Sequence, residues 1–321
     1  MSAYKTGLTA TLALFVFSSL EGKMQLQEAI EGYLLFKSTQ ASATTIQADT
    51  GFLNQFMAWA EENDLHAIET ITAHHIRAYL KSLADRELSP FSIKRHHALL
   101  SAFWTWLSNP EIALAPTHVV HAVPVPKEPK HTVKTLSKDD LTALLTACEH
   151  SQNQRRDRAL ILFLLDSGCR ATEACRIQLQ DFDMHAGKVL VTGKGSKQRY
   201  VYIGKRALQA CWLYLKQERP EPSRNDSNHL FLTQDGYSLD RNGLRHILNR
   251  IGKRAGIRIH PHLFRHTAAI ERLRRGMNLV ALQQFLGHEK METTRKYLTS
   301  LNEEDIEKAA RHTSAADDWR L

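Results

Sequence analysis

Apolar residues repeat every three or four positions along the first part of the chain, the spacing of one face of an α-helix. The first stripe consists of Leu26, Ala29, Ile30, Tyr33 and Leu34. Three further helices are expected to begin near Ser42 or Thr44, after Thr72, and at Ser89-Pro90, where an N-cap residue precedes a proline. Four helices with short connections predict a small bundle.

The helical pattern breaks over residues 109–135, where prolines at 110, 116, 124, 126 and 129 exclude a continuous helix. Lysines at 127, 130 and 134 lie among these prolines. We therefore predict an extended, basic linker over 111–135. It would separate a first domain at 24–110 from a second domain at 136–300.

The second domain begins with a capping-box pattern at Ser137 and Asp140 and contains a strongly apolar helix at 159–168. Two β-branched segments, 188–191 and 199–203, flank a Gly- and Lys-rich turn and predict a hairpin. Further helices are expected at about 205–218, 239–254, 262–275, 279–286 and 291–299. The predicted fold class is mainly α: a four-helix bundle followed by an α-rich domain with a small antiparallel β-sheet.

The charge is distributed unevenly along the 321 residues. The whole chain has a net charge of +8, but residues 1–134 carry a net charge of −1 and residues 135–321 carry +9. The excess of positive charge in the second half is compatible with a polyanionic partner such as nucleic acid, and equally with a solvated basic surface.

The four cysteines, Cys148, Cys169, Cys175 and Cys211, fit no zinc-binding spacing and no disulfide framework. They are interpreted as buried, reduced thiols, which favours a cytoplasmic protein. Residues 8–20 form an apolar run that resembles a signal-peptide core but is too short to span a bilayer. Residues 1–23 are therefore taken as an N-terminal extension, or as a segment that precedes a true start at Met24.

Five short motifs of the second domain carry the candidate chemistry. In chain order they are Gly168-Cys169-Arg170-Ala171-Thr172-Glu173, Gly193-Lys194-Gly195, His262-Leu263-Phe264-Arg265-His266, Leu286-Gly287-His288, and Tyr297. Each motif alone is weak evidence, but their order and intervals resemble the Xer-like tyrosine recombinases, within the tyrosine recombinase (phage integrase) family. The resemblance covers Met24 to the C-terminus. It implies that the bundle is a core-binding, DNA-binding domain and that 136–300 is the catalytic domain.

The resemblance implies six catalytic residues, namely Arg170, Lys194, His262, Arg265, His288 and Tyr297. Arg170 and Arg265 would bind the non-bridging phosphate oxygens, because a guanidinium is planar and permanently charged. Tyr297 would attack the phosphorus and form a 3′-phosphotyrosine. His262 and His288 would hydrogen-bond the phosphate, and His262 alternatively helps to accept the tyrosine proton.

Lys194 would protonate the leaving 5′-hydroxyl, with Lys197 as the runner-up. Glu173 would support the site, unless it forms an ordinary surface pair with Arg176. Neither a Walker-type motif nor a compact carboxylate cluster for Mg²⁺ is found in the sequence. We therefore expect no metal and no other cofactor, including ATP, because a phosphotyrosine conserves the energy of the broken bond.

Basic residues outside the six are candidate DNA contacts. A helix opening at 239–243 carries Arg241, Asn242 and Arg245, and the first two are the expected readers of base edges. Lys197 and Arg199 on the hairpin are further candidates. In the first domain Lys94 and Arg95, followed by His96 and His97, are expected to face the duplex from the other side.

The expected partner is double-stranded DNA with inverted-repeat recombinase sites. The expected assembly is a homo-oligomer, a dimer on each site and a tetramer in the synapse, or a pair with a second recombinase. Residues 301–321 are interpreted as a tail that docks on a neighbouring protomer. Chromosome-dimer resolution, cointegrate resolution, and integration or excision of a mobile element share this chemistry. No membrane partner is expected.

Two other classes compete with this interpretation. A type IB topoisomerase uses a similar residue set but would relax supercoils as a monomer. A catalytically idle, architectural DNA-binding protein would need a decayed site, whereas all six positions are filled here.

Overall fold

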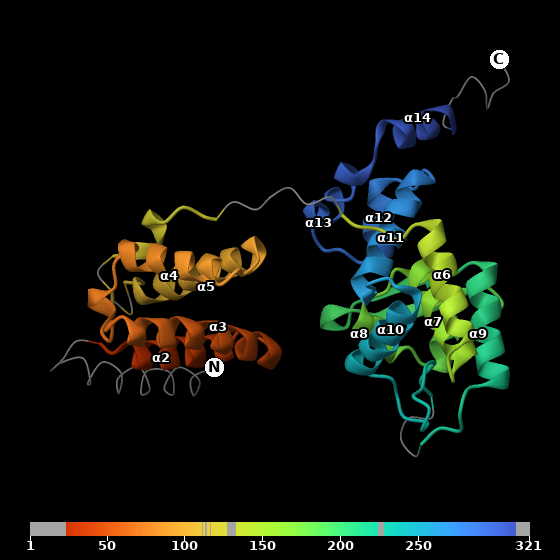
Figure 1. Ribbon diagram of the computed structural model, residues 1–321, viewed down its shortest axis with the longest axis horizontal. Helices are drawn as coiled ribbons and strands as arrows, with labels where there is room; N and C mark the ends of the chain where they lie inside the picture. The colour runs from red at the N-terminus through yellow and green to blue at the C-terminus, as the bar shows by residue number, and fades with distance from the viewer. Residues whose placement is uncertain are drawn as a thin grey trace, which may run out of the picture. The chain divides into compact units, whose positions relative to one another are not determined.

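The computed structural model describes residues 24–110, 112, 114–115, 117–126, 133–223 and 228–312. The expected extension at 1–23 lies outside these ranges. The described chain is mainly helical and divides into two compact units between residues 130 and 131 (Figure 1). Each unit has its own hydrophobic core. The predicted fold class is confirmed, since a helical bundle precedes an α-rich unit with a small antiparallel sheet.

The first unit is the predicted bundle. It contains α2 (Leu26–Ser38), α3 (Ala43–Glu62), α4 (Ala73–Asp85) and α5 (Pro90–Leu107), with the short 3₁₀ helices η1 (Ile68–Thr70) and η2 (Val119–Ala122). Local chemistry sets the helix starts: the Ser42 hydroxyl accepts from the Thr45 amide, and the Ser89 hydroxyl accepts from the Ser92 amide. Aromatic side chains fill the core between the helices, with Trp104 at its centre.

Part of the segment predicted as an extended linker is instead folded onto this bundle. Val120 of η2 and the following Val123 are buried in the first core, and the Arg77 guanidinium donates to the Ala122 carbonyl over 2.7 Å. Proline excludes a continuous α-helix but allows a single 3₁₀ turn between extended stretches. The valines of this turn are apolar, so their burial against the bundle stabilises the folded segment. The first unit therefore continues past residue 110, to Val123 at least.

The second unit is larger and richer in short elements. Before the sheet it contains α6 (Lys138–Glu149), α7 (Gln154–Ser167), α8 (Ala171–Arg176) and η3 (Leu179–Asp181). After the sheet come α9 (Lys205–Gln217), α10 (Arg241–Ala255), α11 (Pro261–Arg274), α12 (Leu279–Leu286), α13 (Met291–Arg295), η5 (Leu298–Ser300) and α14 (Glu303–His312). The apolar helix α7 lies at the centre and packs against α6, α9 and α11 (Figure 1). The helix expected over 291–299 is interrupted, because α13 ends at Arg295 and η5 follows.

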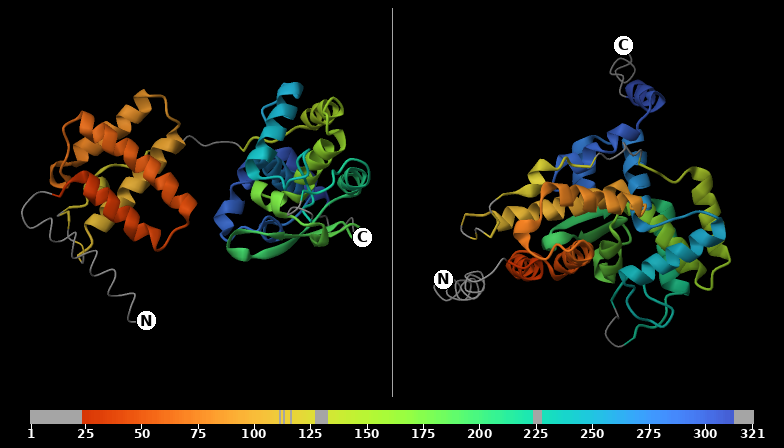
Figure 2. Two further views of the ribbon diagram at one scale, coloured as in Figure 1. Left: turned by 90° about the horizontal axis from the view of Figure 1, so that it is seen from below. Right: turned by 60° about the vertical axis from the view of Figure 1, so that its left-hand side comes forward.

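The predicted hairpin is present and has a third strand that the sequence pattern missed. β1 (Phe182–Asp183), β2 (Lys188–Thr192) and β3 (Gln198–Tyr202) form an antiparallel sheet in that order, with Leu190 opposite Tyr200. The 3₁₀ turn η4 (Lys194–Ser196) joins β2 to β3. The sheet lies along one edge of the second unit, with helices on one side of it (Figure 2). β1 has two residues, too few for alternation to be detected.

A membrane-spanning helix would need about 20 consecutive apolar residues. Over the described ranges, no helix has the length and apolar character to cross a bilayer.

Candidate active site

Arg170 is placed by a sharp turn between two helices. α7 ends where Gly168 takes a positive φ of 58°, and Arg170 is already the N-cap of α8. A side chain at Gly168 would be strained by this φ, and its Cβ would lie 3.2 Å from the Leu286 side chain of α12. The turn at Gly168 therefore passes too close to α11 and α12 to hold a side chain without strain, and this close approach sets the position of Arg170.

Glu173 anchors two arginines from within the protein. Its side chain is 2% exposed; one carboxylate oxygen accepts from Arg170 at 2.7 Å and the other accepts from Arg199 at 2.8 Å. Burial alone would raise its pKa, but the hydrogen bonds and charge of Arg199 and the hydrogen bonds of Arg170 lower the pKa to about 2. The alternative of a surface pair with Arg176 is wrong, because Glu173 is buried.

Arg199 does not lie where a DNA contact was expected. Its side chain is 13% exposed, and it donates to Glu173 and to the Phe285 carbonyl at 2.8 Å. The reason is strand alternation, since Arg199 shares the inner face of β3 with buried Val201. In this structure Arg199 holds Glu173 and α12 in place, and its predicted contact with DNA stays a prediction.

Arg265 is the most deeply buried cation of the site. It is 3% exposed, and its guanidinium donates to the carbonyls of Gly168 and Leu286, each over 2.7 Å. These two carbonyls lie at the C-terminal ends of α7 and α12, where helices leave unpaired acceptors and a partial negative charge. Burial, followed by the charge of Arg170, lowers the pKa of Arg265 to about 10, so it is charged at neutral pH.

His288 is oriented by a threonine that none of the five motifs includes. Its Nδ1 lies 2.8 Å from the hydroxyl of Thr294, which is fully buried on α13. Burial, together with the charges of Arg265 and Arg170, lowers the pKa of His288 to about 3. The ring is therefore neutral at neutral pH. In the tautomer whose Nε2 carries the proton, Nδ1 accepts from Thr294 and Nε2 can donate to an anion.

His262 begins the same helix as Arg265, one turn earlier. The residue is exposed at the surface, but surrounding protein atoms partly desolvate its ring, and this desolvation and then the charge of Arg265 lower its pKa. The structure thus brings four predicted residues, Arg170, Arg265, His262 and His288, into one electrostatic environment.

Tyr297 belongs to this environment too. The residue is 1% exposed, and its ring centroid lies 6.3 Å from that of His288. Burial raises the pKa of Tyr297, while the charges of Arg265 and Arg170 oppose that rise. The hydroxyl lies 3.2 Å from Nδ1 of His266, a residue to which the sequence motifs assigned no role.

The two candidate lysines lie at the hairpin turn. The backbone of Lys194 begins η4, but its side chain lies outside the described part of the chain, so its predicted role stays a prediction. Lys197 forms an ion pair with Glu289 at 2.8 Å, and both side chains are largely exposed. Exposed pairs of this kind contribute little energy, so this ion pair is no obstacle to the predicted roles of Lys197, which stay predictions.

The predicted DNA-contacting residues of α10 are free of the protein core. Arg241, Asn242 and Arg245 are exposed, and the helix is capped by the Asp240 carboxylate, which accepts from the Gly243 amide at 2.6 Å. Their exposure on the first two turns agrees with the expected base-reading position, which stays a prediction.

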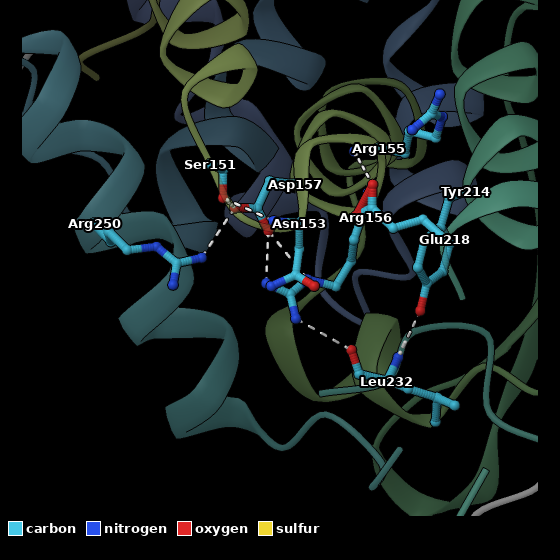
Figure 3. Close-up of polar contacts among 9 residues, drawn as sticks. All are labelled: Ser151, Asn153, Arg155, Arg156, Asp157, Tyr214, Glu218, Leu232 and Arg250. Carbon is cyan, nitrogen blue, oxygen red and sulfur yellow. Dashed lines mark hydrogen bonds and ion pairs between the residues drawn. The ribbon is translucent and has the colours of Figure 1, made fainter. Parts of the chain in front are cut away.

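A buried network fixes α10 against α7. Asp157 is fully buried and accepts from Ser151 at 2.6 Å, from Arg156 at 2.9 Å and from Arg250 of α10 at 3.0 Å (Figure 3). Arg250, whose side chain stays 42% exposed, therefore ties α10 to the buried Asp157. In the same region the Glu218 carboxylate accepts from two amides at the start of α7 and caps that helix (Figure 3).

The basic start of α5 divides between surface and core. Lys94 is half-buried, and the exposed Arg95 lies over the Phe52 ring, 4.8 Å from its centroid. His96 and His97 do not face outward as expected, because they are 2% and 6% exposed. His97 contacts the Val123 carbonyl at 3.0 Å, and His96 contacts the Tyr79 hydroxyl. The folded segment around η2 explains the burial of His97.

Taken together, these features define a class of site. The site combines a buried arginine held by two helix ends with a second arginine held by a buried carboxylate. It also contains two neutral histidines and a phenol. This set of groups suits attack on a phosphodiester. Such a site supplies positive charge to the phosphate and a covalent nucleophile from the protein itself.

The chain belongs to the phage integrase family, whose profile matches residues 134–304. The phage integrase N-terminal SAM-like domain matches residues 26–113. Among curated relatives, tyrosine recombinase XerC of Oceanobacillus iheyensis is 31% identical, covering 85% of this chain and 92% of that protein. Tyrosine recombinase XerC of Staphylococcus aureus is 33% identical, covering 82% and 88% respectively.

Solved structures share the fold at low sequence identity. The Tn1549 transposon integrase, in complex with a circular intermediate DNA, is 17% identical with a TM-score of 0.73, over 91% of this chain and 100% of that one. A lambda integrase dimer bound to a core site is also 17% identical, with a TM-score of 0.69, over 84% and 97%.

The family and the relatives together make this chain a tyrosine-type site-specific recombinase. They confirm the predicted class and do not favour the topoisomerase or the idle DNA-binding protein.

Proposed function

We propose that Tyr297 is the nucleophile of this recombinase and that it forms a 3′-phosphotyrosine with one DNA strand. The observation that carries the proposal is the position of its phenol, which shares a buried environment with the fixed charge of Arg265. Attack places extra negative charge on the phosphate oxygens, and preorganised cations stabilise that charge without reorganisation.

The other residues act around this step. Arg170 and Arg265 bind the non-bridging oxygens, and Glu173 positions Arg170. His262 and His288 donate hydrogen bonds to the same phosphate, and Lys194 protonates the 5′-oxygen as it leaves. The 5′-hydroxyl of a second strand then attacks the phosphotyrosine and reseals a recombined junction. The protein's own charges carry the chemistry, so cleavage proceeds without a metal ion or ATP.

The substrate is double-stranded DNA with inverted-repeat sites around a short spacer. One protomer occupies each repeat, and two such dimers form the tetrameric synapse, either of this chain alone or with a second recombinase. The exposed Arg241 and Asn242 read base edges and Arg245 contacts the DNA beside them, while Lys94 and Arg95 contact the DNA from the first unit. The reaction serves dimer or cointegrate resolution, or movement of a genetic element.

A nicked suicide substrate tests the nucleophile. It loses a short fragment after cleavage, so the covalent complex accumulates and resists denaturing electrophoresis. Wild-type protein should form this complex in excess EDTA. The Tyr297→Phe variant should bind the same DNA within about threefold and form no complex. A strict requirement for a divalent metal, or a persistent complex in the variant, would falsify the proposal.

The C-terminal segment is proposed to join protomers. α14 is held to its own α11 by the Arg274–Asp305 ion pair at 3.2 Å, yet Ile306 is 61% exposed. The expected docking segment is 301–321, of which residues 313–321 lie outside the described part of the chain. Removal of residues 301–321 should reduce synapsis and recombination by more than about tenfold while single-site DNA binding is retained. Full recombination by the truncated protein would contradict this role.

A further inference from the structure

His266 is the residue of α11 that contacts the Tyr297 hydroxyl. Its Nδ1 lies 3.2 Å from the phenolic oxygen, and the two ring centroids are 5.6 Å apart. His262 lies one helical turn away, with its ring centroid 6.2 Å from that of His266. Nδ1 of His288 faces Thr294 instead. Among the described histidines of the site, His266 has the geometry of a proton acceptor for this tyrosine.

The protonation state of His266 fits an acceptor. Burial, followed by the charges of Lys296 at the C-cap of α13, of the neighbouring histidines and of Arg265, lowers its pKa to about 4. The groups that face it are His260, His262, Arg265, Lys296 and Tyr297. The ring is neutral at neutral pH and half-buried, so one nitrogen keeps a lone pair. With Nε2 protonated, Nδ1 accepts the hydrogen bond that the phenol donates.

We propose that His266 is the general base that takes the phenolic proton of Tyr297 during DNA cleavage, which rests on Tyr297 being the nucleophile. The O–H bond of Tyr297 breaks, its proton moves to Nδ1 of His266, and its electron pair forms the new O–P bond. The P–O5′ bond breaks with its electron pair on the 5′-oxygen, which takes a proton from the general acid. Religation runs the same transfers backwards, so Tyr297 regains its proton from His266.

The energetics require the transfer to accompany bond formation. In the resting pair the phenol is a much weaker acid than the histidinium, because burial raises one pKa and lowers the other. As the O–P bond forms, the phenolic oxygen becomes the oxygen of an aryl ester and its proton becomes strongly acidic. The bound phosphate also brings negative charge, which offsets the Lys296 and Arg265 charges that disfavour a protonated His266.

An asparagine substitution separates a base from a positioning residue. In His266→Asn the amide oxygen can accept a hydrogen bond at the place of Nδ1 but cannot take up a proton at neutral pH. We expect single-turnover cleavage of the suicide substrate to slow by about 10²–10⁴-fold, the usual contribution of a general base, while DNA affinity changes less than threefold. His150→Asn, at the exposed end of α6, is the matched control and should cleave like the wild type.

Rescue by free imidazole distinguishes a general base from a structural residue, because imidazole in solution can replace a missing base but not a missing structural contact. In His266→Ala, added imidazole should restore cleavage by at least about tenfold, and the restored rate should rise with pH as imidazole loses its proton. The wild-type rate should fall with decreasing pH as His266 becomes protonated, and His266→Asn should lack this acidic limb.

Cleavage by His266→Asn within threefold of the wild-type rate, or no imidazole rescue of His266→Ala, would overturn the assignment. Failure of the proposed function has a different signature. In that case the wild-type protein forms no covalent complex, or Tyr297→Phe still forms one.

Discussion

Within the described residues, a buried tyrosine contacts a histidine ring nitrogen at two places, one in each unit. In the first unit the Tyr79 hydroxyl lies 2.9 Å from Nδ1 of His96; in the second the Tyr297 hydroxyl lies 3.2 Å from Nδ1 of His266. Both tyrosines are 1% exposed, and burial is the leading cause that lowers the pKa of each histidine to about 4. By contact and protonation state, the two pairs are nearly equivalent.

Their surroundings differ. Tyr79 packs edge-on against Phe56, and His96 packs edge-on against Phe52, within the aromatic core of the bundle. The charge acting on Tyr79 comes from Arg86, an exposed residue at the end of α4. Tyr297 instead lies beside Arg265, whose charge is buried and held by two helix ends. A hydrogen-bonded phenol is thus a candidate nucleophile only where fixed positive charge lies beside it and can stabilise a bound phosphate.

The largest effect is expected from altering that fixed charge. In Arg265→Lys a single ammonium replaces a guanidinium that donates to two carbonyls and faces the phenol, so the bidentate geometry is lost. Suicide-substrate cleavage should fall by at least about 10³-fold with the chain still folded. Arg86→Lys makes the same change at the exposed arginine near Tyr79 and should leave cleavage unchanged. Equal rates for the wild type and Arg265→Lys would show that the buried charge is not what distinguishes the two pairs.

A smaller effect, on stability as well as rate, is expected from Glu173→Gln. The change leaves Arg170 and Arg199 without their shared carboxylate. Removal of one partner from a buried ion pair costs about 3 kcal/mol in the free energy of unfolding. Cleavage should also slow, because Arg170 loses its anchor.

The difference in the free energy of unfolding between the wild type and Glu173→Gln should depend on pH in one direction. The pKa of Glu173 in the folded protein, about 2, lies below its ordinary value of 4.5, so its stabilisation is complete above pH 4.5. It is lost as the pH falls toward 2. Urea titrations of both proteins between pH 7 and pH 3 should show the stability gap narrowing below pH 4.5, and a gap that widens there would contradict the ion-pair account.

The smallest effect is expected outside the site, at α10. Arg241→Ala should weaken binding to the cognate site by about 1–3 kcal/mol and relax base preference at one position. Cleavage at saturating protein should be unchanged, since Arg241 does not contact the tyrosine pair. Binding isotherms on cognate and scrambled sites measure this, and equal losses on both would reduce Arg241 to a phosphate contact.

The sequence predicted most helices well, because their signals are local. Ser89 before Pro90, the Ser137–Asp140 capping box and Asp240 each mark a helix start that the structure retains. The folded segment at η2 was missed, because its valines are buried by residues distant in sequence. Strand β1 was missed because two residues are too few to show the alternation of apolar and polar positions that marks a strand.

In the active site too, features with a local sequence signal were predicted and features that depend on tertiary packing were not. Motif spacing indicated Arg170, Arg265, His288 and Tyr297, and the structure places them in one environment. It did not indicate that Arg199 faces inward, although alternation with Val201 on the strand was a usable signal. The role of Thr294 depends on how α13 folds against α12, and that of His266 depends on where Tyr297 lies relative to α11; no local pattern reports either.

Mapping the covalent attachment tests the central claim most directly. After cleavage of a suicide substrate, nuclease and trypsin digestion leave a nucleotide remnant on one peptide, which tandem mass spectrometry can identify. The account predicts the remnant on Tyr297, in the peptide 297–308, with the Tyr79 peptide unmodified. A remnant on Tyr79 or on any residue other than Tyr297 would contradict it.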